Sequence, residues 1–241
     1  MSKKIALVVG GTSGIGLATA QAFAEAGYTT TIAGRDEHRG QQVAADHDLH
    51  FKKCDVTDAN APATLVESII SEYGQLDAAF NNAGWEGPAA PTDEVSEQDW
   101  LKMIDTKLNG VWRCVVAELG PMKKQSHGTI VNMAGNWGLV GFPNYAPYCA
   151  AAHGIMGLTK AAAMEYAKQG IRINAVCPGA VDAPMLDRMV GGSEAIKSSF
   201  GEQLAIGRIC SAQEVASAVV WLSSDEASYV NGVGLNLDGG G

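Results

Sequence analysis

The stretch Ile5-Ala6-Leu7-Val8-Val9-Gly10-Gly11-Thr12-Ser13-Gly14-Ile15-Gly16 decides the fold of this chain. Its apolar run predicts a buried strand, and the glycines after it predict a tight turn into a helix over Leu17–Ala26. Such a turn brings phosphate oxygens against backbone N–H groups at a helix N-terminus, where the helix dipole favours negative charge. The stretch therefore predicts a strand–turn–helix unit that binds the pyrophosphate of a dinucleotide through Gly10, Thr12, Ser13, Gly14, Ile15 and Gly16.

The rest of the chain continues this alternation of short apolar runs and longer amphipathic segments. Apolar strands separated by helices predict a parallel sheet that is covered on both faces. No linker rich in Pro, Gly or Ser divides the chain, and no repeat recurs at a fixed period. We therefore expect an α/β fold with a single Rossmann-type, doubly wound parallel sheet, and one domain over residues 1–241. Later strands are expected at Thr29–Ala33, Asp77–Phe80, Thr129–Asn132 and Arg172–Val176, and helices at Ala61–Tyr73, Glu97–Lys124, Ala150–Lys168 and Ala212–Ser223.

The composition excludes several classes of partner. Lys and Arg number 17 against 26 Asp and Glu, so the formal net charge is −9, which argues against nucleic acid or an anionic membrane as the partner. The five cysteines are an odd number and form no C-x-x-C pair, as expected for isolated thiols in a reducing compartment. No segment resembles a signal peptide or a membrane span. These features predict a cytoplasmic protein that acts on a small molecule.

The end of the second expected strand bears on the choice of nucleotide. An acidic residue at this position would accept both ribose hydroxyls of NAD(H) and repel a 2′-phosphate, but here the strand ends in Gly34-Arg35-Asp36. The guanidinium of Arg35 is suited to phosphate, which favours NADP(H) over NAD(H). Asp36 argues in the other direction, and a solvated Arg35 on the surface is the alternative interpretation.

Together these motifs resemble the short-chain dehydrogenase/reductase family, and the likeness runs from Ile5 to Gly240. The resemblance implies a nicotinamide nucleotide as cofactor, with the adenine beside Asp55 and Val56 and the nicotinamide beside a Pro-Gly loop. The matching motifs are Gly10, Gly14 and Gly16 in G-x-x-x-G-x-G, Asp55-Val56, Asn81-Asn82-Ala83-Gly84, Pro178-Gly179 with Val181 and Pro184-Met185, and Asp238-Gly239-Gly240; they imply cofactor contacts by Asp55, Val56, Asn82, Ala83, Gly84, Tyr148, Pro178, Gly179 and Val181.

The catalytic positions implied by this resemblance are mostly substituted. The family transfers a hydride between the nicotinamide and a carbonyl or alcohol carbon, with a Tyr as proton donor, a Lys that stabilises its phenolate, a Ser and an Asn. Tyr148 matches the catalytic Tyr, whereas the Lys, Ser and Asn positions hold Ala152, Gly135 and Lys107. A positioned proton-transfer group is typically worth about 10²–10⁴ in rate, so weakened or altered oxidoreductase chemistry is expected.

The substitution at position 107 does more than remove the expected Asn, because Lys107 brings an ammonium to the helix that packs beside the Tyr helix in this family. A Lys side chain reaches about 6 Å, so Lys107 could place its charge near Tyr148 and replace the missing Lys. The alternative is that Lys107 extends into solvent. Two residues correspond to about 200° of helix rotation, so Asn109 points away, and His153 likewise lies off the Tyr face.

Two other classes of function remain open. A lysine in an apolar pocket can act as a Schiff-base nucleophile, so Lys107 with Tyr148 could run non-redox chemistry, in a natural or an engineered site. Trp85, Trp137 and Phe142 are candidate walls of such a pocket. The chain could also be a pseudoenzyme that binds the cofactor without turnover.

Other features of the sequence predict the absence of a metal site, a lid segment, core residues and the assembly. Asp46-His47-Asp48 with His50 falls in a polar connection, so we expect no metal site. The segment Asp187–Leu204 is expected to form a mobile lid over the substrate. Trp112, Met156 and Met164 are expected in the core. The resemblance implies a homotetramer that uses the helices around Lys107 and Tyr148 and the apolar C-terminal strand Val233–Leu237.

Overall fold

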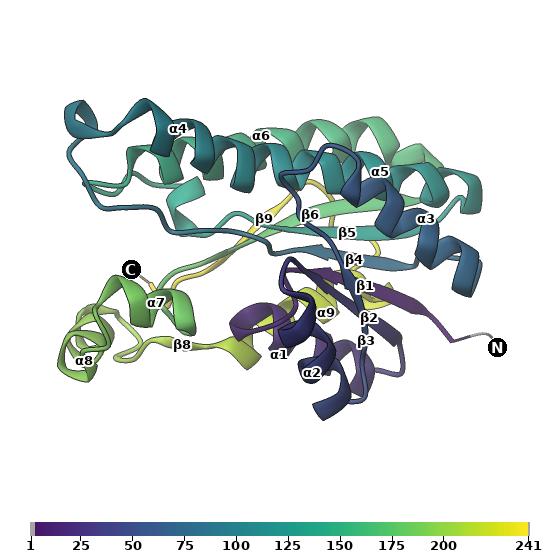
Figure 1. The fold of residues 1–241 in the computed structure, drawn as a ribbon, viewed down its shortest axis with the longest axis horizontal. Coiled ribbons are helices and arrows are strands. Elements are labelled where there is room, and N and C mark those ends of the chain that lie inside the picture. The colour runs from purple at the N-terminus through teal and green to yellow at the C-terminus, as the bar shows by residue number, and fades with distance from the viewer. Residues whose placement is uncertain (1–2, 241) are drawn as a thin grey trace.

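The described residues, 3–240 in this computed structural model, are organised around a seven-stranded sheet in which every pair of neighbours is parallel. The order is β3-β2-β1-β4-β5-β6-β9, so the chain runs outward in both directions from β1 and β4 (Figure 1). This reversal creates a crevice at the carboxyl ends of the strands. The strands are β1 (Ile5–Val9), β2 (Thr29–Gly34), β3 (His50–Lys53), β4 (Ala78–Asn81), β5 (Gly128–Met133), β6 (Ile171–Pro178) and β9 (Gly234–Leu237).

Helices cover both faces of the sheet, as the sequence predicts (Figure 1). Along β1, Leu7 and Val9 pack into one hydrophobic cluster, whereas Ala6 and Val8 pack into the other. Both faces of the sheet are therefore buried against apolar side chains, which explains the continuous apolar strands. One face carries α1 (Gly14–Glu25), α2 (Glu37–Asp46) and α9 (Ala212–Ser223), and the other carries α3 (Ala61–Tyr73), α4 (Glu97–Met103), α5 (Gly110–Gln125) and α6 (Ala146–Tyr166).

Two expectations about these helices are wrong. The segment Glu97–Lys124 is not one regular helix, because a π-helical segment, Ile104–Asn109, separates α4 from α5. Trp112 and Met164 are not core residues, since they are 51% and 84% exposed on the outer faces of their helices. Hydrophobic type alone does not distinguish the inner face of a helix from an apolar outer face.

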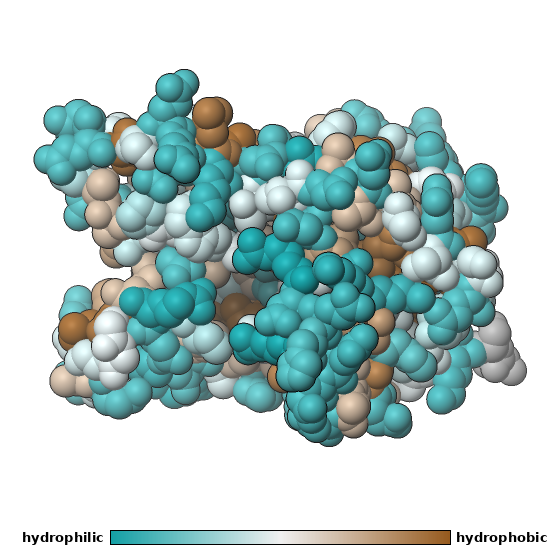
Figure 2. Space-filling model, viewed as in Figure 1, coloured by the Kyte–Doolittle hydropathy of each residue, from teal (hydrophilic) through white to brown (hydrophobic). Residues whose placement is uncertain are grey.

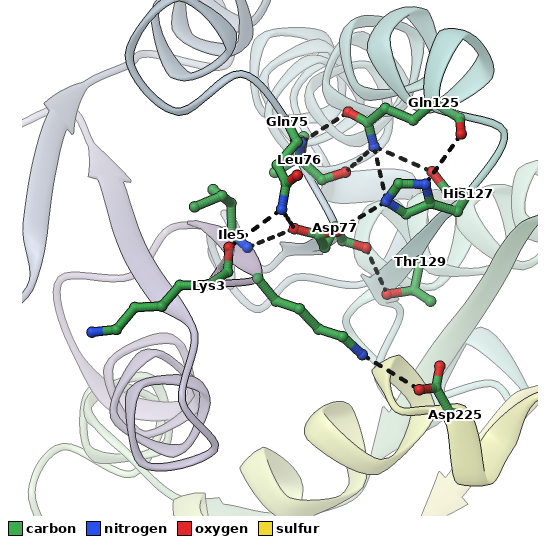
Figure 3. A network of polar contacts seen from close by, with 10 residues as sticks. Lys3, Ile5, Gln75, Leu76, Asp77, Gln125, His127, Thr129 and Asp225 are labelled. Carbon is green, nitrogen blue, oxygen red and sulfur yellow. Dashed lines mark hydrogen bonds and ion pairs between the residues drawn. The ribbon is translucent and has the colours of Figure 1, made fainter. Parts of the chain in front are cut away.

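The amino ends of the strands are joined by a polar network centred on Asp77 (Figure 3). Its carboxylate accepts hydrogen bonds from the backbone N–H of Ile5 at 2.7 Å and from Nε2 of Gln75 at 2.9 Å, and it lies 3.0 Å from Nε2 of His127. These contacts connect the starts of β1, β4 and β5. They fix the sheet at the end opposite the crevice, which leaves the carboxyl ends available for a site.

No helix within residues 3–240 is long and apolar enough to span a membrane.

Candidate active site

A cavity of about 870 Å³ lies at the carboxyl ends of the strands. Its floor is formed by the ends of β1, β2, β4, β5 and β6, and its outer wall by α7 (Pro184–Met189) and α8 (Glu194–Gln203). A short ribbon of β7 (Val181–Asp182) and β8 (Cys210–Ser211) supports this wall. Figure 2 shows the hollow between the surface over α4 and the surface over α7 and α8.

The glycine turn after β1 is shaped for close backbone approach. Gly10 has a φ of +79°, and a Cβ at this position would lie 2.7 Å from the backbone nitrogen of Ala83. Asn82 Nδ2 donates a 3.0 Å hydrogen bond to the Gly10 carbonyl and so holds the turn. The side chain of Ser13, the N-cap of α1, makes no capping hydrogen bond, and the first turn carries no acidic residue. The N–H groups at the start of α1 therefore fit an anion such as a pyrophosphate.

The strand tips near Arg35 form the other end of the cavity. Arg35, Asp55 and Val56 all line it. Burial acts to raise the pKa of Asp55, but hydrogen bonds from Thr57 at 3.0 Å and 2.8 Å outweigh it and keep this pKa below its usual value. The carboxylate of Asp36 instead accepts a hydrogen bond from a backbone N–H in the first turn of α2 and serves as its N-cap.

At the opposite end the structure brings Lys107 and Tyr148 together. Lys107 is only 2% exposed, and its Nζ lies 4.2 Å from the centroid of the Tyr148 ring. The same nitrogen donates a 3.4 Å hydrogen bond to the carbonyl of Met133. Both side chains line the cavity. Lys107 therefore does not extend into solvent, and the ammonium stands against the phenol from the neighbouring π-helical segment.

Gly135 and Ala152, which occupy the expected Ser and Lys positions, offer no polar side chain to the Tyr148 hydroxyl. A Cβ on Gly135 would lie 3.4 Å from the Tyr148 hydroxyl, but Gly135 has a φ of +82°, which side-chain-bearing residues rarely adopt. Ala152 is fully buried. The local backbone at position 135 is therefore shaped for glycine and not for a serine in the same conformation.

Aromatic side chains form the wall beyond Tyr148. The ring of Trp137 stacks on Phe142 at 4.4 Å between centroids, and it meets Tyr148 edge-on at 5.1 Å. Tyr145 completes the group at 4.8 Å from Trp137. All four line the cavity, so they give this end of it a largely aromatic wall.

Other residues considered from the sequence lie elsewhere. Trp85 does not line the cavity, contrary to expectation; its ring packs under the Lys102 ammonium at 4.1 Å. His153 is exposed and contacts the Cys149 carbonyl, and Asn109 donates to Asp105, so neither reaches the cavity. Within residues 3–240, no group of three or more His, Cys, Asp or Glu is arranged to hold a metal ion.

The segment 187–204, which is expected to form a lid, contains the end of α7 and all of α8, and α7 itself begins at Pro184. Arg188 of α7, which lines the cavity, makes a bidentate ion pair with Glu86, at 2.6 Å and 2.9 Å. Hydrogen bonding from Arg188 holds the pKa of Glu86 below its usual value. Lys197 of α8 pairs with Asp182 and Asp187, so α7, α8 and β7 are tied into one unit. Sequence reasoning missed the Glu86–Arg188 pair, because 102 residues separate its members.

The predicted cofactor residues converge on this cavity with one exception. Gly16 does not line it; a Cβ there would meet the Gly10 carbonyl, so Gly16 allows α1 to pack closely on the turn. No sequence signal marked Thr106, Asn136 or Val140 as lining residues. The lining residues Met189, Phe200 and Gln203 lie in the segment 187–204 that is expected over the substrate. The predicted residues that line the cavity are Gly10, Thr12, Ser13, Gly14, Ile15, Arg35, Asp55, Val56, Asn82, Ala83, Gly84, Tyr148, Pro178, Gly179 and Val181.

Comparisons with known proteins agree with the family resemblance seen in the sequence. A family model described as enoyl-(acyl carrier protein) reductase matches residues 9–241, and relatives named as dehydrogenases and reductases match nearly the whole chain. The chain belongs to the short-chain dehydrogenase/reductase family. The family and the Rossmann-type fold predicted from the sequence are therefore confirmed.

Three members of this family illustrate the similarity. The 3β-hydroxysteroid dehydrogenase of Mediterraneibacter gnavus is 36% identical over 264 residues, covering 99% of this chain and 94% of the relative. The cis-4-hydroxycyclohexanecarboxylate dehydrogenase of Sinomonas cyclohexanicum is 37% identical, covering 99% and 96%. A crystal structure of an actinorhodin polyketide ketoreductase variant with NADPH superposes with a TM-score of 0.93 at 33% identity, covering 100% and 98%.

Proposed function

We propose that residues 1–241 form one domain that interconverts a secondary alcohol and a ketone with NADP(H), using Tyr148 as the proton donor and acceptor and Lys107 as its charged partner. The observation that carries this proposal is the buried Lys107 ammonium, 4.2 Å from the centroid of the Tyr148 ring inside the cavity. The family's Lys position is Ala152, so Lys107 supplies from another helix the charge that is missing there.

The chain's own residues account for binding and proton transfer. A bound nicotinamide would supply or accept the hydride. The glycine turn and the start of α1 would hold the diphosphate, with Asn82 fixing the turn. In the reductive direction, the Tyr148 hydroxyl gives its proton to the substrate oxygen, and the Lys107 ammonium stabilises the phenolate that remains. Gly135 offers the substrate oxygen no hydroxyl, so turnover is slower than with a Ser at this position.

The preference for NADP(H) is proposed on Arg35. Its guanidinium lines the cavity at the tip of β2, and the nearby carboxylate of Asp36 is occupied in capping α2. Replacing Arg35 with Ala should weaken NADPH binding more than NADH binding in calorimetry. Arg39→Ala, which removes a guanidinium that does not line the cavity, is the matched control. Equal effects of Arg35→Ala on both nucleotides would contradict the preference.

We propose a small molecule with a carbonyl or hydroxyl group on a hydrocarbon ring as the substrate. The stacked Trp137 and Phe142 give a flat apolar wall next to Tyr148. Relatives named for hydroxysteroid and hydroxycyclohexanecarboxylate substrates support this class. The net charge of −9 supports neither nucleic acid nor an anionic membrane as partner.

The proposed assembly is a homotetramer in the cytoplasm. Leu101 of α4 and Trp112 and Val116 of α5 are large apolar side chains, each more than half exposed. Trp112 and Val116 are four residues apart, so they share one helix face, as expected for a contact between identical subunits. The five cysteines are all unpaired, which supports a reducing compartment.

Calorimetry and a turnover screen test the proposed activity together. NADPH and NADP+ are titrated into the protein, and NADPH consumption is followed with a panel of cyclic ketones. We expect binding and measurable consumption. Binding without consumption of any ketone would favour the pseudoenzyme interpretation. Absence of binding to either nucleotide would overturn the proposal.

A further inference from the structure

Two lysines are buried among residues 3–240, and they differ in their partners. Lys197 is 8% exposed and pairs with Asp182, Asp187 and Glu194. Lys107 is 2% exposed, and none of the ion pairs formed by the described residues includes it. The first lysine is a structural cross-link. The second is a buried amine that the described part of the chain does not neutralise.

The contacts of Lys107 suit a neutral amine as well as an ammonium. Its nitrogen donates to the Met133 carbonyl at 3.4 Å and faces the Tyr148 ring. A neutral amine keeps the hydrogen bond to the carbonyl and frees its lone pair. No carboxylate among the described residues forms an ion pair with Lys107.

The space around Lys107 accommodates a carbonyl compound when no nucleotide is bound. Met133, Gly135 and Tyr148 line the same cavity, and Gly135 has no side chain in front of the Tyr148 hydroxyl. The aromatic wall of Trp137 and Phe142 lies beyond it. A nucleophile, a proton-transfer group and an apolar surface for a ring are thus combined in one cavity.

We propose that the nucleotide-free protein has a second, non-redox activity: Lys107 forms a Schiff base with a cyclic ketone, and Tyr148 moves protons to and from the adjacent carbon. This activity does not rest on the proposed hydride transfer. The expected net reaction is exchange of the hydrogens next to the carbonyl with solvent.

The steps balance without an oxidant or reductant. The neutral Lys107 nitrogen adds to the carbonyl carbon, and a proton passes from that nitrogen to the oxygen, which gives a neutral carbinolamine. The carbinolamine takes the Tyr148 proton and loses water, leaving an iminium ion and a phenolate. The phenolate removes a proton from the adjacent carbon, which gives a neutral enamine and restores the phenol. In D2O the phenol carries deuterium, so reversal of the steps returns a deuterated ketone.

The test uses the full chain without nucleotide, with cyclohexanone as the probe. Sodium cyanoborohydride reduces any iminium to a stable secondary amine, and peptide mass spectrometry locates it. We expect Lys107 to be labelled faster than Lys168, which is exposed on the surface and serves as the internal reference. Labelling of Lys107 no faster than Lys168 would overturn the proposal, whatever the behaviour of any variant.

A second measurement follows deuterium uptake by cyclohexanone in D2O by NMR. Lys107→Arg retains the charge but offers no amine nucleophile, so it should abolish the exchange. Tyr148→Phe should lower it about 10²-fold or more while Lys107 is still labelled. Exchange that persists at the wild-type rate in Lys107→Arg would contradict the proposal. Because no nucleotide is present, either result is independent of whether NADPH is consumed.

Discussion

Glu118 of α5 offers a quantitative test of the structure, because it is a fully buried carboxyl group. One carboxyl oxygen accepts a 3.0 Å hydrogen bond from Asn81 Nδ2, and the other has no hydrogen-bond partner among the described residues. Burial, opposed only by the Asn81 hydrogen bond, raises the pKa of Glu118 to about 7 from its ordinary value of 4.5. The native chain therefore holds a proton that the unfolded chain releases.

The sign and size of the effect follow from this difference. Between the two pKa values the native state binds more protons than the unfolded state, so the free energy of unfolding falls as pH rises. The contribution of Glu118 is full below its unfolded value and is lost as pH rises through its folded value. Between about pH 5 and about pH 8 the expected loss is about 2.5 kcal/mol.

Glu118→Gln should remove this pH dependence, because an amide does not titrate in this range. Urea unfolding followed by tryptophan fluorescence at both pH values gives the free energies. The stability of the variant relative to wild type should increase by about 2.5 kcal/mol from pH 5 to pH 8, and this double difference cancels any pH-independent cost of the amide. Glu165→Gln, on the exposed surface of α6, is the matched control. Parallel pH dependence of Glu118→Gln and wild type would refute the reasoning.

Three further predictions concern the site and the surface. Gly135→Ser should destabilise the native state by about 1–3 kcal/mol, because Gly135 has a φ of +82°. Gly157→Ser, at an open helical position, is the control and should not destabilise it. Equal melting temperatures of the two variants in thermal scanning would contradict this prediction. Glu86→Gln breaks the ion pair with Arg188, whose side chain is about half exposed to solvent. The variant should release NADPH about fivefold faster in stopped flow, which corresponds to about 1 kcal/mol, and an unchanged rate would show that this pair does not slow release. Trp112→Glu should lower the mass measured by light scattering, and an unchanged mass removes the proposed contact.

Much of the fold could be predicted because its determinants are local. The strand Ile5–Val9 and the helices Ala61–Tyr73 and Ala212–Ser223 have the predicted bounds, since each has an uninterrupted apolar pattern between turn signals. The π-helical segment 104–109 could not be predicted, because its register depends on contacts with neighbouring elements. The exposure of Trp112 likewise depends on which helix face meets the sheet.

The candidate site likewise has features that the sequence predicts and features that depend on tertiary packing. The glycine turn and the positions around Tyr148 are fixed by motifs, so their meeting at one cavity followed from the sequence. The orientation of Lys107 was one of two alternatives, and only the packing of its segment against α6 distinguishes them. No sequence pattern indicates the Glu86–Arg188 ion pair. The sequence also does not show that the Trp85 ring packs against Lys102 instead of lining the cavity.

A single-turnover measurement with Lys107→Met tests most directly whether this lysine supports Tyr148 in hydride transfer. NADPH oxidation is followed at saturating cyclic ketone in wild type and variant across a pH series. We expect a rate at least about 10²-fold lower in the variant, with an altered pH profile. If both proteins oxidise NADPH at the same rate with the same profile, Lys107 does not act on Tyr148.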